Sequence, residues 1–463
     1  MKWRRGKGAR KRREWFSGAG CAAVGGVLFL LGVAAYLALI TLLTNEQREE
    51  IAELKERIRE AGQPLTLEEL NAYYPAVPDE ENAALVYHEA SVLLDEIDPN
   101  GATVDALLRS LELSSGNDAS LPELQQEIGA FLERCGEVFA HLERAATMPK
   151  ARYPIEFSTR WSAIPAHFHY LERCARLEKL AALHGLLDGR QWEASECLKR
   201  MHHMAKSLER EPFMTSQIVR TSILIEHVES VEMGLKLAYL YPETLADIET
   251  LYVDTSDPEP LVRALAGERC LWLAEPRIPK AVEEVSVVGR VINYLDPAGQ
   301  STFRQARLLS YQEAILKTYE RLIRLAKEPW EERLTYTQDL RDNGTGWRRS
   351  VEFDGHPLYV ALHGTDRMAL ETLFARTTLL TVALERYRET YDALPQTLDE
   401  LVPEFIDAIP VDPFDGQPLR YVVTDQKYAI YSVAFDRVDD GGAPLEPIGE
   451  MDSVGDWVFE VRQ

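Results

Sequence analysis

The sequence predicts a mainly α-helical protein with a single transmembrane helix, an extracytoplasmic helical body and a small C-terminal α+β domain with an antiparallel sheet. Three observations predict this class: an uncharged apolar run at residues 15–44, helical periodicity over residues 64–328, and alternating strand-like segments after residue 419. The chain has 463 residues, of which 46% are hydrophobic. It is therefore long enough for two or three domains and apolar enough to form packed cores.

Charge is divided unevenly along the chain. Residues 1–14 contain eight bases and one acid, whereas the whole chain has a net charge of −24. The core of the apolar run, residues 21–43, is long enough to cross a hydrocarbon layer, which takes about 20 residues in a helix. The positive-inside rule places the basic tail in the cytoplasm. We therefore expect residues 15–44 to contact the lipid bilayer of the inner (cytoplasmic) membrane, and residues 45–463 to be periplasmic.

The acidic composition disfavours some partners and favours others. Binding to nucleic acid needs Lys and Arg to replace counterions, and anionic lipid surfaces attract basic segments. A chain with 75 Asp and Glu against 51 Lys and Arg suits neither. It suits cationic protein partners or divalent cations, so we expect a protein partner in the cell envelope and no nucleic acid.

Cysteine spacing excludes the common zinc and thioredoxin-like motifs, because no CxxC pair occurs. Four of the five cysteines follow the apolar run: Cys135, Cys174, Cys197 and Cys270. Buried free thiols are the simpler interpretation. Disulfides stay open, because they persist in an oxidising compartment such as the periplasm.

The segments after the apolar run read as a helical stalk at residues 45–63 and a helical domain at residues 64–328. In this domain Thr66 and Glu69 can form a capping box, and residues 122–145 read as one long helix with Pro122 in its first turn. Three further helices between residues 161 and 240 are joined by short turns, so they pack as antiparallel neighbours. Both a bundle and a short helical-repeat array fit this pattern.

No catalytic motif stands out in the sequence. HExxH, a Gly-rich phosphate loop and a GxSxG elbow are all missing, so we assign no catalytic or cofactor-binding residue. Five histidines fall in one helical hairpin, but histidines one or two positions apart on a helix do not converge on an ion. They are His167, His169, His184, His202 and His203.

The pattern changes near the C-terminus. Residues 329–365 read as a connecting loop, and residues 366–463 as the α+β domain. This domain starts with a helix that ends near Tyr391 and continues with a proline-rich loop. Strands are expected at residues 420–424, 427–435 and 457–461, with a hairpin turn at Asp425 and Gln426.

The order of these pieces resembles the C-terminal half of the major (G type) pseudopilins of type II secretion. The resemblance covers about 95 residues, and the rest of the chain resembles uncharacterised bacterial single-pass membrane proteins. The matching residues are Ala383, Leu384, Tyr387, Leu394, Pro395, Leu398, Leu401, Val402, Pro403, Pro410, Asp412, Pro413, Phe414, Gly416, Pro418, Tyr421, Tyr431, Ser432, Asp436 and Asp456. The apolar run lacks the prepilin leader and its glutamate, so the resemblance implies a pseudopilin-like module on a different kind of protein.

The resemblance also implies a calcium site, because the loop before the last strand of the pseudopilin binds calcium. The matching segment, residues 436–456, is acidic, and its glycines allow backbone carbonyls to turn inward. We expect Asp436 and Asp456 as calcium ligands, supplemented by Asp439, Asp440 or Asp452. A solvated acidic loop without a metal is the alternative.

Together these features predict a membrane-anchored extracytoplasmic interaction or scaffold protein. One alternative is an envelope hydrolase whose site is assembled from residues distant in sequence. The other is a component associated with secretion or a pseudopilus.

Overall fold

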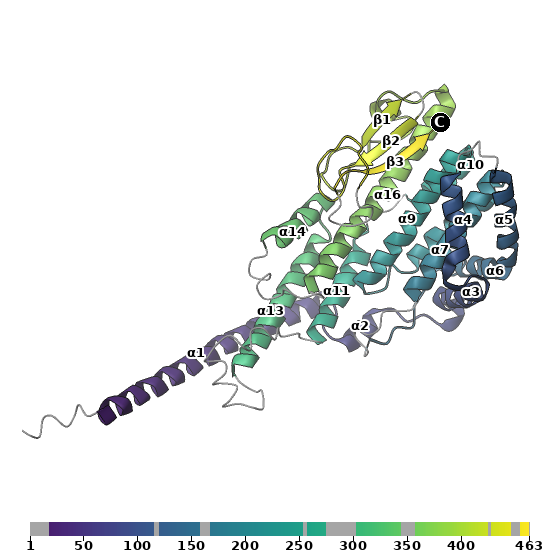
Figure 1. Ribbon diagram of the computed structural model, residues 1–463. Helices are drawn as coiled ribbons and strands as arrows, with labels where there is room; N and C mark the ends of the chain where they lie inside the picture. The colour runs from purple at the N-terminus through teal and green to yellow at the C-terminus, as the bar shows by residue number, and fades with distance from the viewer. Residues whose placement is uncertain are drawn as a thin grey trace, which may run out of the picture. The chain divides into compact units, whose positions relative to one another are not determined.

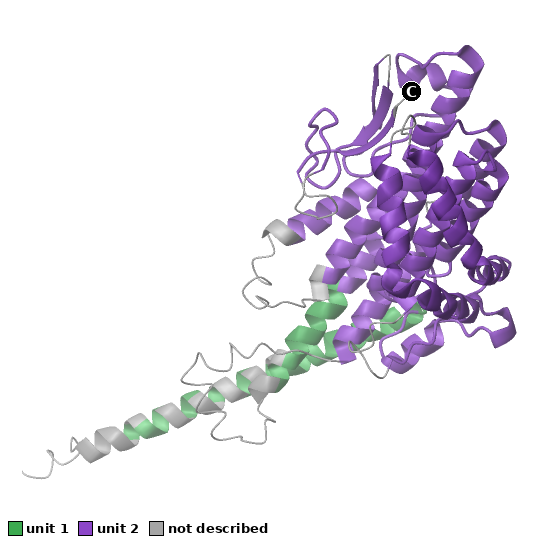
Figure 2. Ribbon diagram, turned by 45° about the vertical axis from the view of Figure 1, so that its right-hand side comes forward, with its two compact units in different colours: residues 1–62, 275–318 green, residues 63–274, 319–463 purple. Residues whose placement is uncertain are grey.

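The computed structural model describes residues 18–114, 120–157, 167–252, 257–274, 302–343, 357–424, 427–445 and 454–462. Most of these residues are helical, and a small sheet lies near the C-terminus (Figure 1). The chain divides into two compact units (Figure 2). The first contains residues 1–62 and 275–318, and the second contains residues 63–274 and 319–463.

The predicted transmembrane helix at residues 15–44 requires a correction. Residues 18–44 of this segment belong to helix α1 (Gly18–Glu60). A helix that crosses a membrane needs about 20 consecutive residues that are predominantly apolar. Within the part of the chain that the structure describes, no helix combines that length with that apolarity. The predicted fold class is wrong in this element, and the bilayer contact and inner-membrane location that rested on it are not supported.

In the first unit, the second half of α1 pairs with α13 (Thr302–Leu325), so the predicted stalk is not an isolated helix. The Gln47 amide donates to Ser310 Oγ at 3.2 Å and to Glu313 Oε2 at 2.9 Å. Lys317 Nζ lies 2.5 Å from Glu50 Oε1. The polar side chains of the stalk therefore have partners within its own unit.

The second unit begins with two capped helices. In α2 (Leu67–Tyr73), Thr66 Oγ1 accepts from the Glu69 N–H at 3.1 Å, which confirms the predicted N-terminal cap. Glu69 reaches back to the Leu65 N–H at 2.6 Å. Helix α3 (Ala83–Ile97) starts at Asn82, whose Oδ1 accepts from the Ala84 N–H.

The helical body continues through eight further helices in the described ranges. They are α4 (Ala102–Leu113), α5 (Leu121–Arg134), α6 (Gly136–Ala146), α7 (His167–Leu187), α8 (Gln191–Lys206), α9 (Met214–Leu237), α10 (Pro242–Leu251) and α11 (Glu259–Ala274). The single helix predicted at residues 122–145 is two helices, because the backbone leaves helical geometry at Cys135 (φ −86°, ψ 8°). Gly136 follows directly, and glycine favours such a break.

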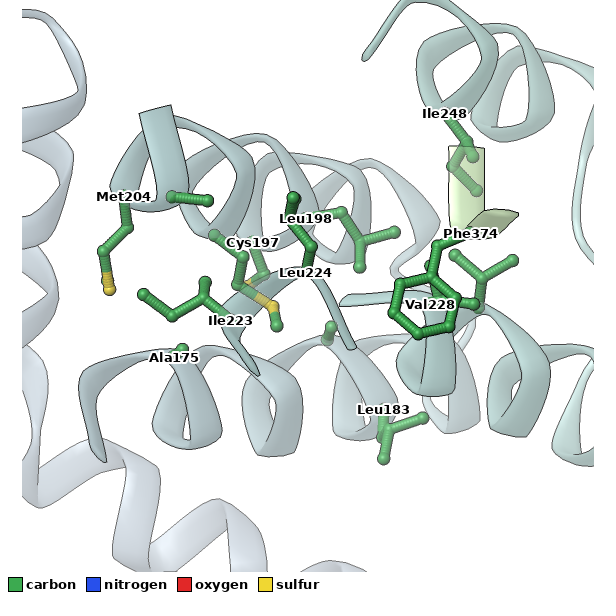
Figure 3. Packing of buried hydrophobic residues seen from close by; sticks show 14 of the residues in the cluster. Ala175, Leu183, Cys197, Leu198, Met204, Ile223, Leu224, Val228, Ile248 and Phe374 are labelled. Atoms are coloured by element: carbon green, nitrogen blue, oxygen red, sulfur yellow. The ribbon is translucent and has the colours of Figure 1, made fainter. Parts of the chain in front are cut away.

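Helix α9 is the centre of the second unit, with contacts to α7, α8, α11 and the C-terminal elements. Figure 3 shows the core around it, in which Ile223, Leu224 and Val228 of α9 pack with Cys197 and Leu198 of α8. Cys135, Cys174, Cys197 and Cys270 are all buried and free. The interpretation as buried thiols therefore holds for these four cysteines.

The C-terminal part differs from the prediction at its start. The predicted loop at residues 329–365 contains helix α14 (Trp330–Asn343) and the first turns of α16 (Pro357–Tyr391). Trp330 Nε1 donates to Thr372 Oγ1 at 2.8 Å, which attaches α14 to α16. A short 3-10 helix, η6 (Leu398–Leu401), follows in the proline-rich loop.

The three predicted strands are confirmed as β1 (Arg420–Thr424), β2 (Lys427–Ser432) and β3 (Trp457–Arg462). They form an antiparallel sheet in the order β1-β2-β3, and the predicted turn at residues 425–426 lies outside the described residues. Tyr428 of β2 donates from its hydroxyl to Glu385 Oε1 of α16 at 2.7 Å. The Glu460 N–H of β3 donates to Glu232 Oε1 of α9 at 3.2 Å. The sheet is thus held on both long helices.

Helix α11 meets the turn before α9 at very close range. A Cβ atom added to Gly267 would lie 1.6 Å from the Pro212 carbonyl oxygen, so only glycine fits there. The next residue, Glu268, is 1% exposed, and its Oε1 accepts from the Met214 N–H at the start of α9. Burial raises the pKa of Glu268 from 4.5 to about 7.

This raised pKa makes stability depend on pH. The folded state holds the Glu268 proton more tightly than the unfolded chain, so its stabilisation is fully present below pH 4.5 and is lost as pH rises to about 7. The total change is roughly 3 kcal/mol for such a shift. Glu268→Gln keeps an acceptor for the Met214 N–H. We expect this substitution to reduce the pH dependence of the free energy of unfolding in urea between pH 4.5 and 7. Glu259→Gln is the control, because Glu259 lies on the same helix but is half-exposed and paired with Arg263. An unchanged pH dependence in Glu268→Gln would contradict the assignment.

Candidate metal centre

The loop between β2 and β3 carries the site predicted from the sequence. It leaves the sheet after Ser432 and returns at Trp457. Of the five predicted aspartates, Asp452 lies outside the described residues. The other four lie in the two described parts of the loop, residues 433–445 and 454–456.

Asp456 is the most unusual of these residues, because its side chain is fully buried. Its Oδ2 accepts from the Gly442 N–H at 2.7 Å. Its Oδ1 has no hydrogen-bond partner among the residues that the structure describes. Burial raises the pKa of Asp456, and the like charges of Asp439 and Asp440 raise it further. Burying a carboxylate oxygen without a hydrogen-bond donor or a cation costs free energy. A cation bound at Asp456 Oδ1 would remove this cost.

Asp436 contacts the backbone of the residue that precedes Asp456. Its Oδ2 accepts from the Gly455 N–H at 3.1 Å, and its Oδ1 accepts from the Val438 N–H at 3.0 Å. Gly455 has φ +107°, and a Cβ there would lie 2.9 Å from the carbonyl oxygens of Ala443 and Pro444. The structure therefore joins the two ends of the loop at Gly455, between the two aspartates expected as principal ligands.

Asp439 and Asp440 play lesser parts in this arrangement. Asp439 Oδ1 accepts from the Gly441 N–H, and its Oδ2 lies 3.4 Å from Arg420 Nε, so an arginine already neutralises part of its charge. Asp440 is exposed, and its backbone N–H bonds the Asp456 carboxylate. Over the described ranges, no group of three or more His, Cys, Asp or Glu side chains is placed to hold a metal. Any metal here would need backbone carbonyls as well as the two carboxylates.

Asp412 is a second buried aspartate, but both of its carboxylate oxygens have hydrogen-bond partners. It is also fully buried, but its Oδ1 accepts from the Phe414 N–H and from Ser432 Oγ, both at 2.9 Å. Its Oδ2 accepts from the Val433 N–H at 3.0 Å and from Arg420 Nη1 at 2.9 Å. In the sequence, Asp412 stands out only as one of the residues that match the pseudopilin pattern. Arg420, at the start of β1, was the one sequence feature that could have indicated an ion pair with Asp412.

The buried cysteines do not have the character of activated nucleophiles. Burial raises the pKa of Cys135 to about 11 and the pKa values of Cys174 and Cys270 to about 12. A reactive thiol needs a lowered pKa, because the thiolate is the nucleophile. These three thiols are therefore structural.

Comparison with known proteins gives no family for this chain: no family model, no curated protein and no solved structure matches it. The class of protein follows from its own residues. It is a mainly helical protein with a small antiparallel sheet and an acidic loop that holds a half-paired buried carboxylate.

Replacing each of the two buried aspartates by asparagine should change the free energy of unfolding differently. In EDTA, Asp412→Asn should lower the free energy of unfolding by about 3 kcal/mol, because its amide would face hydrogen-bond donors and leave Arg420 without its partner. Asp456→Asn should leave stability unchanged or raise it, because it removes an uncompensated buried charge while keeping an acceptor for Gly442. Urea unfolding of the full chain measures both. Equal destabilisation by the two substitutions would contradict the contrast.

Proposed function

We propose that the protein is an interaction or scaffold protein, and that residues 366–463 form a pseudopilin-like domain whose acidic loop is ordered by a calcium ion. The observation that carries this proposal is the buried Asp456 carboxylate, which has one oxygen without a partner in the described part of the chain. Asp436 bonds the backbone N–H of the preceding residue, Gly455.

Calcium fits this loop better than other common metals. Calcium takes 6–8 oxygen ligands, accepts backbone carbonyls and tolerates irregular geometry, whereas magnesium demands a near-ideal octahedron. Asp436 and Asp456 would supply carboxylate oxygens, and the loop backbone around Ala443 and Pro444 would supply carbonyls. Asp440 is exposed and is a further candidate ligand, and Asp452 lies outside the described residues. The ion would neutralise the buried charge and tie both ends of the loop to the sheet.

Two features of the fold support the pseudopilin-like domain. A long helix is followed by a proline-rich loop and then by a three-stranded antiparallel sheet that bonds back to the helix through Tyr428 and Glu385. The acidic loop comes directly before the last strand, as it does in the family that the sequence resembles.

The burial of α16 supports a scaffold role over a role as a pilus subunit. Helix α16 is in contact with α9, α10, α11 and α14 of its own chain. Most of the described residues of α16 are buried or half-buried, so little of the helix is exposed for lengthwise packing between subunits. The domain is therefore used as part of a larger helical body, which suits a protein that presents surfaces to partners.

Calcium should protect the acidic loop. We expect millimolar Ca²⁺ to slow amide hydrogen exchange in peptides that cover residues 436–456 of the full chain, relative to EDTA. A ligand at a hundredfold over its Kd stabilises by about 2.7 kcal/mol, which is readily measured. Magnesium at the same concentration and the Asp456→Asn variant are the controls. Identical exchange in calcium and in EDTA would overturn the calcium part of the proposal.

The interaction role predicts a reproducible protein partner in cells. Crosslinking of the full chain in its native host, followed by co-purification, should recover the same partner in independent experiments. The partner should also bind the purified protein with a measurable Kd. Recovery of secretion-system components would favour the pseudopilus alternative, and recovery of nothing reproducible would contradict the interaction role.

A further inference from the structure

A large open cleft lies in the helical body, away from the acidic loop. Its walls come from α5, α6, α7 and α8, and its volume is about 1230 Å³. Pockets for small molecules usually enclose about 300–1,000 Å³ and are mostly apolar. This cleft is larger and carries many charged side chains, so an extended polypeptide segment fits it better than a compact metabolite.

The walls of the cleft are negatively charged. The lining residues include five acids and four bases: Glu133, Glu143, Asp188, Glu193 and Glu196, with Arg190, Lys199, Arg200 and Lys206. Three of the acids are paired within the lining: Arg190 pairs with Asp188 and Glu193, and Lys199 lies 2.9 Å from Glu196. Arg200 makes a two-pronged ion pair with the buried Glu178 at 2.6 and 2.8 Å, outside the lining. The lining therefore has one more acid than base, and Glu133 and Glu143 are its least compensated carboxylates.

The lining histidines do not offset this charge. His184, His202 and His203 all face the cleft, and burial lowers the pKa of each of them. They are neutral at physiological pH as a result. Glu143 is 65% exposed and lies 3.9 Å from the nearest arginine nitrogen, and Glu133 on α5 is also exposed. These two carboxylates are the most accessible to a ligand.

An exposed aromatic ring lies at the start of α8, in the lining of the cleft. Trp192 lines the cleft and is 71% exposed. Its neighbour Gln191 holds the segment before α10, because Gln191 Oε1 accepts from the Tyr241 N–H at 2.7 Å. The rings of Tyr239 and Tyr241 are about half exposed, with centroids 5.9 Å apart. Exposed Trp and Tyr are frequent anchors in interfaces, and their ring faces attract Arg and Lys.

We infer that this cleft binds a basic, extended segment of a partner protein. Glu133 and Glu143 pair with its Lys or Arg side chains, and Trp192 stacks against a guanidinium group or an aliphatic stem. Charge complementarity and the exposed aromatic ring select this occupant over an acidic or purely apolar one. The inference rests on the proposed interaction role and is independent of the calcium loop.

The test is fluorescence anisotropy of the full-length protein with a labelled 12-residue peptide rich in Arg and Lys, at low salt. Glu133→Lys with Glu143→Lys should weaken binding by about tenfold or more, because each reversal replaces an attraction by a repulsion. Trp192→Ala should weaken it by about fivefold or more. Raising the salt concentration should weaken binding of the unaltered protein.

Matched variants separate the cleft from general electrostatics. Glu112→Lys with Glu127→Lys changes the net charge equally, and Glu127 lies on α5 outside the cleft, so this pair should retain most of the affinity. Tyr391→Ala removes an exposed aromatic ring elsewhere. The inference is overturned if the basic peptide does not bind, if both charge-reversal pairs lose affinity equally, or if a Glu-substituted peptide binds as tightly. Loss of peptide binding with a retained calcium response contradicts the cleft alone, and the reverse contradicts the calcium loop alone.

Discussion

The second unit depends on the burial of helix α9. A helix that is buried on most of its surface must find partners inside the protein for each polar side chain it carries. Gln217 donates to the carbonyl oxygens of Leu208 and Glu211, which closes the turn before α9. Arg220 donates to Gln217 and pairs with Glu371 of α16. These polar contacts set the position of neighbouring elements along α9, which apolar packing alone would leave less defined.

The same constraint positions the C-terminal sheet and its loop. Because α16 lies against α9, and β3 bonds to Glu232 of α9, the strands have little freedom to shift. The two buried aspartates at the end of the sheet then differ in one respect. Asp412 has an arginine and three further donors, whereas Asp456 accepts from backbone N–H groups, has no basic partner and has no partner on Oδ1 within the described residues. That difference in charge compensation separates a structural aspartate from a proposed metal ligand.

Both proposed recognition features use the negative charge of the chain, but they use it differently. The acidic loop concentrates carboxylates around a buried oxygen, which suits a small hard cation. The cleft spreads its carboxylates along helical walls and adds an exposed tryptophan, which suits a longer cationic segment. A net charge of −24 does not distinguish these cases, because burial and spacing decide which kind of cation each site can hold.

The sequence by itself determined the local features: the strands β1, β2 and β3, the cap at Thr66, and the end of α16 at Tyr391. These depend on alternation, capping chemistry and turn residues, which act over a few positions. The transmembrane helix predicted at residues 15–44 is contradicted, because no helix in the described part of the chain is long and apolar enough to span a membrane. Tertiary structure alone decided which aspartates are buried, that Asp436 bonds the Gly455 backbone, and that four helices line an open cleft. These features depend on contacts between residues distant in sequence, and periodicity carries no information about such contacts.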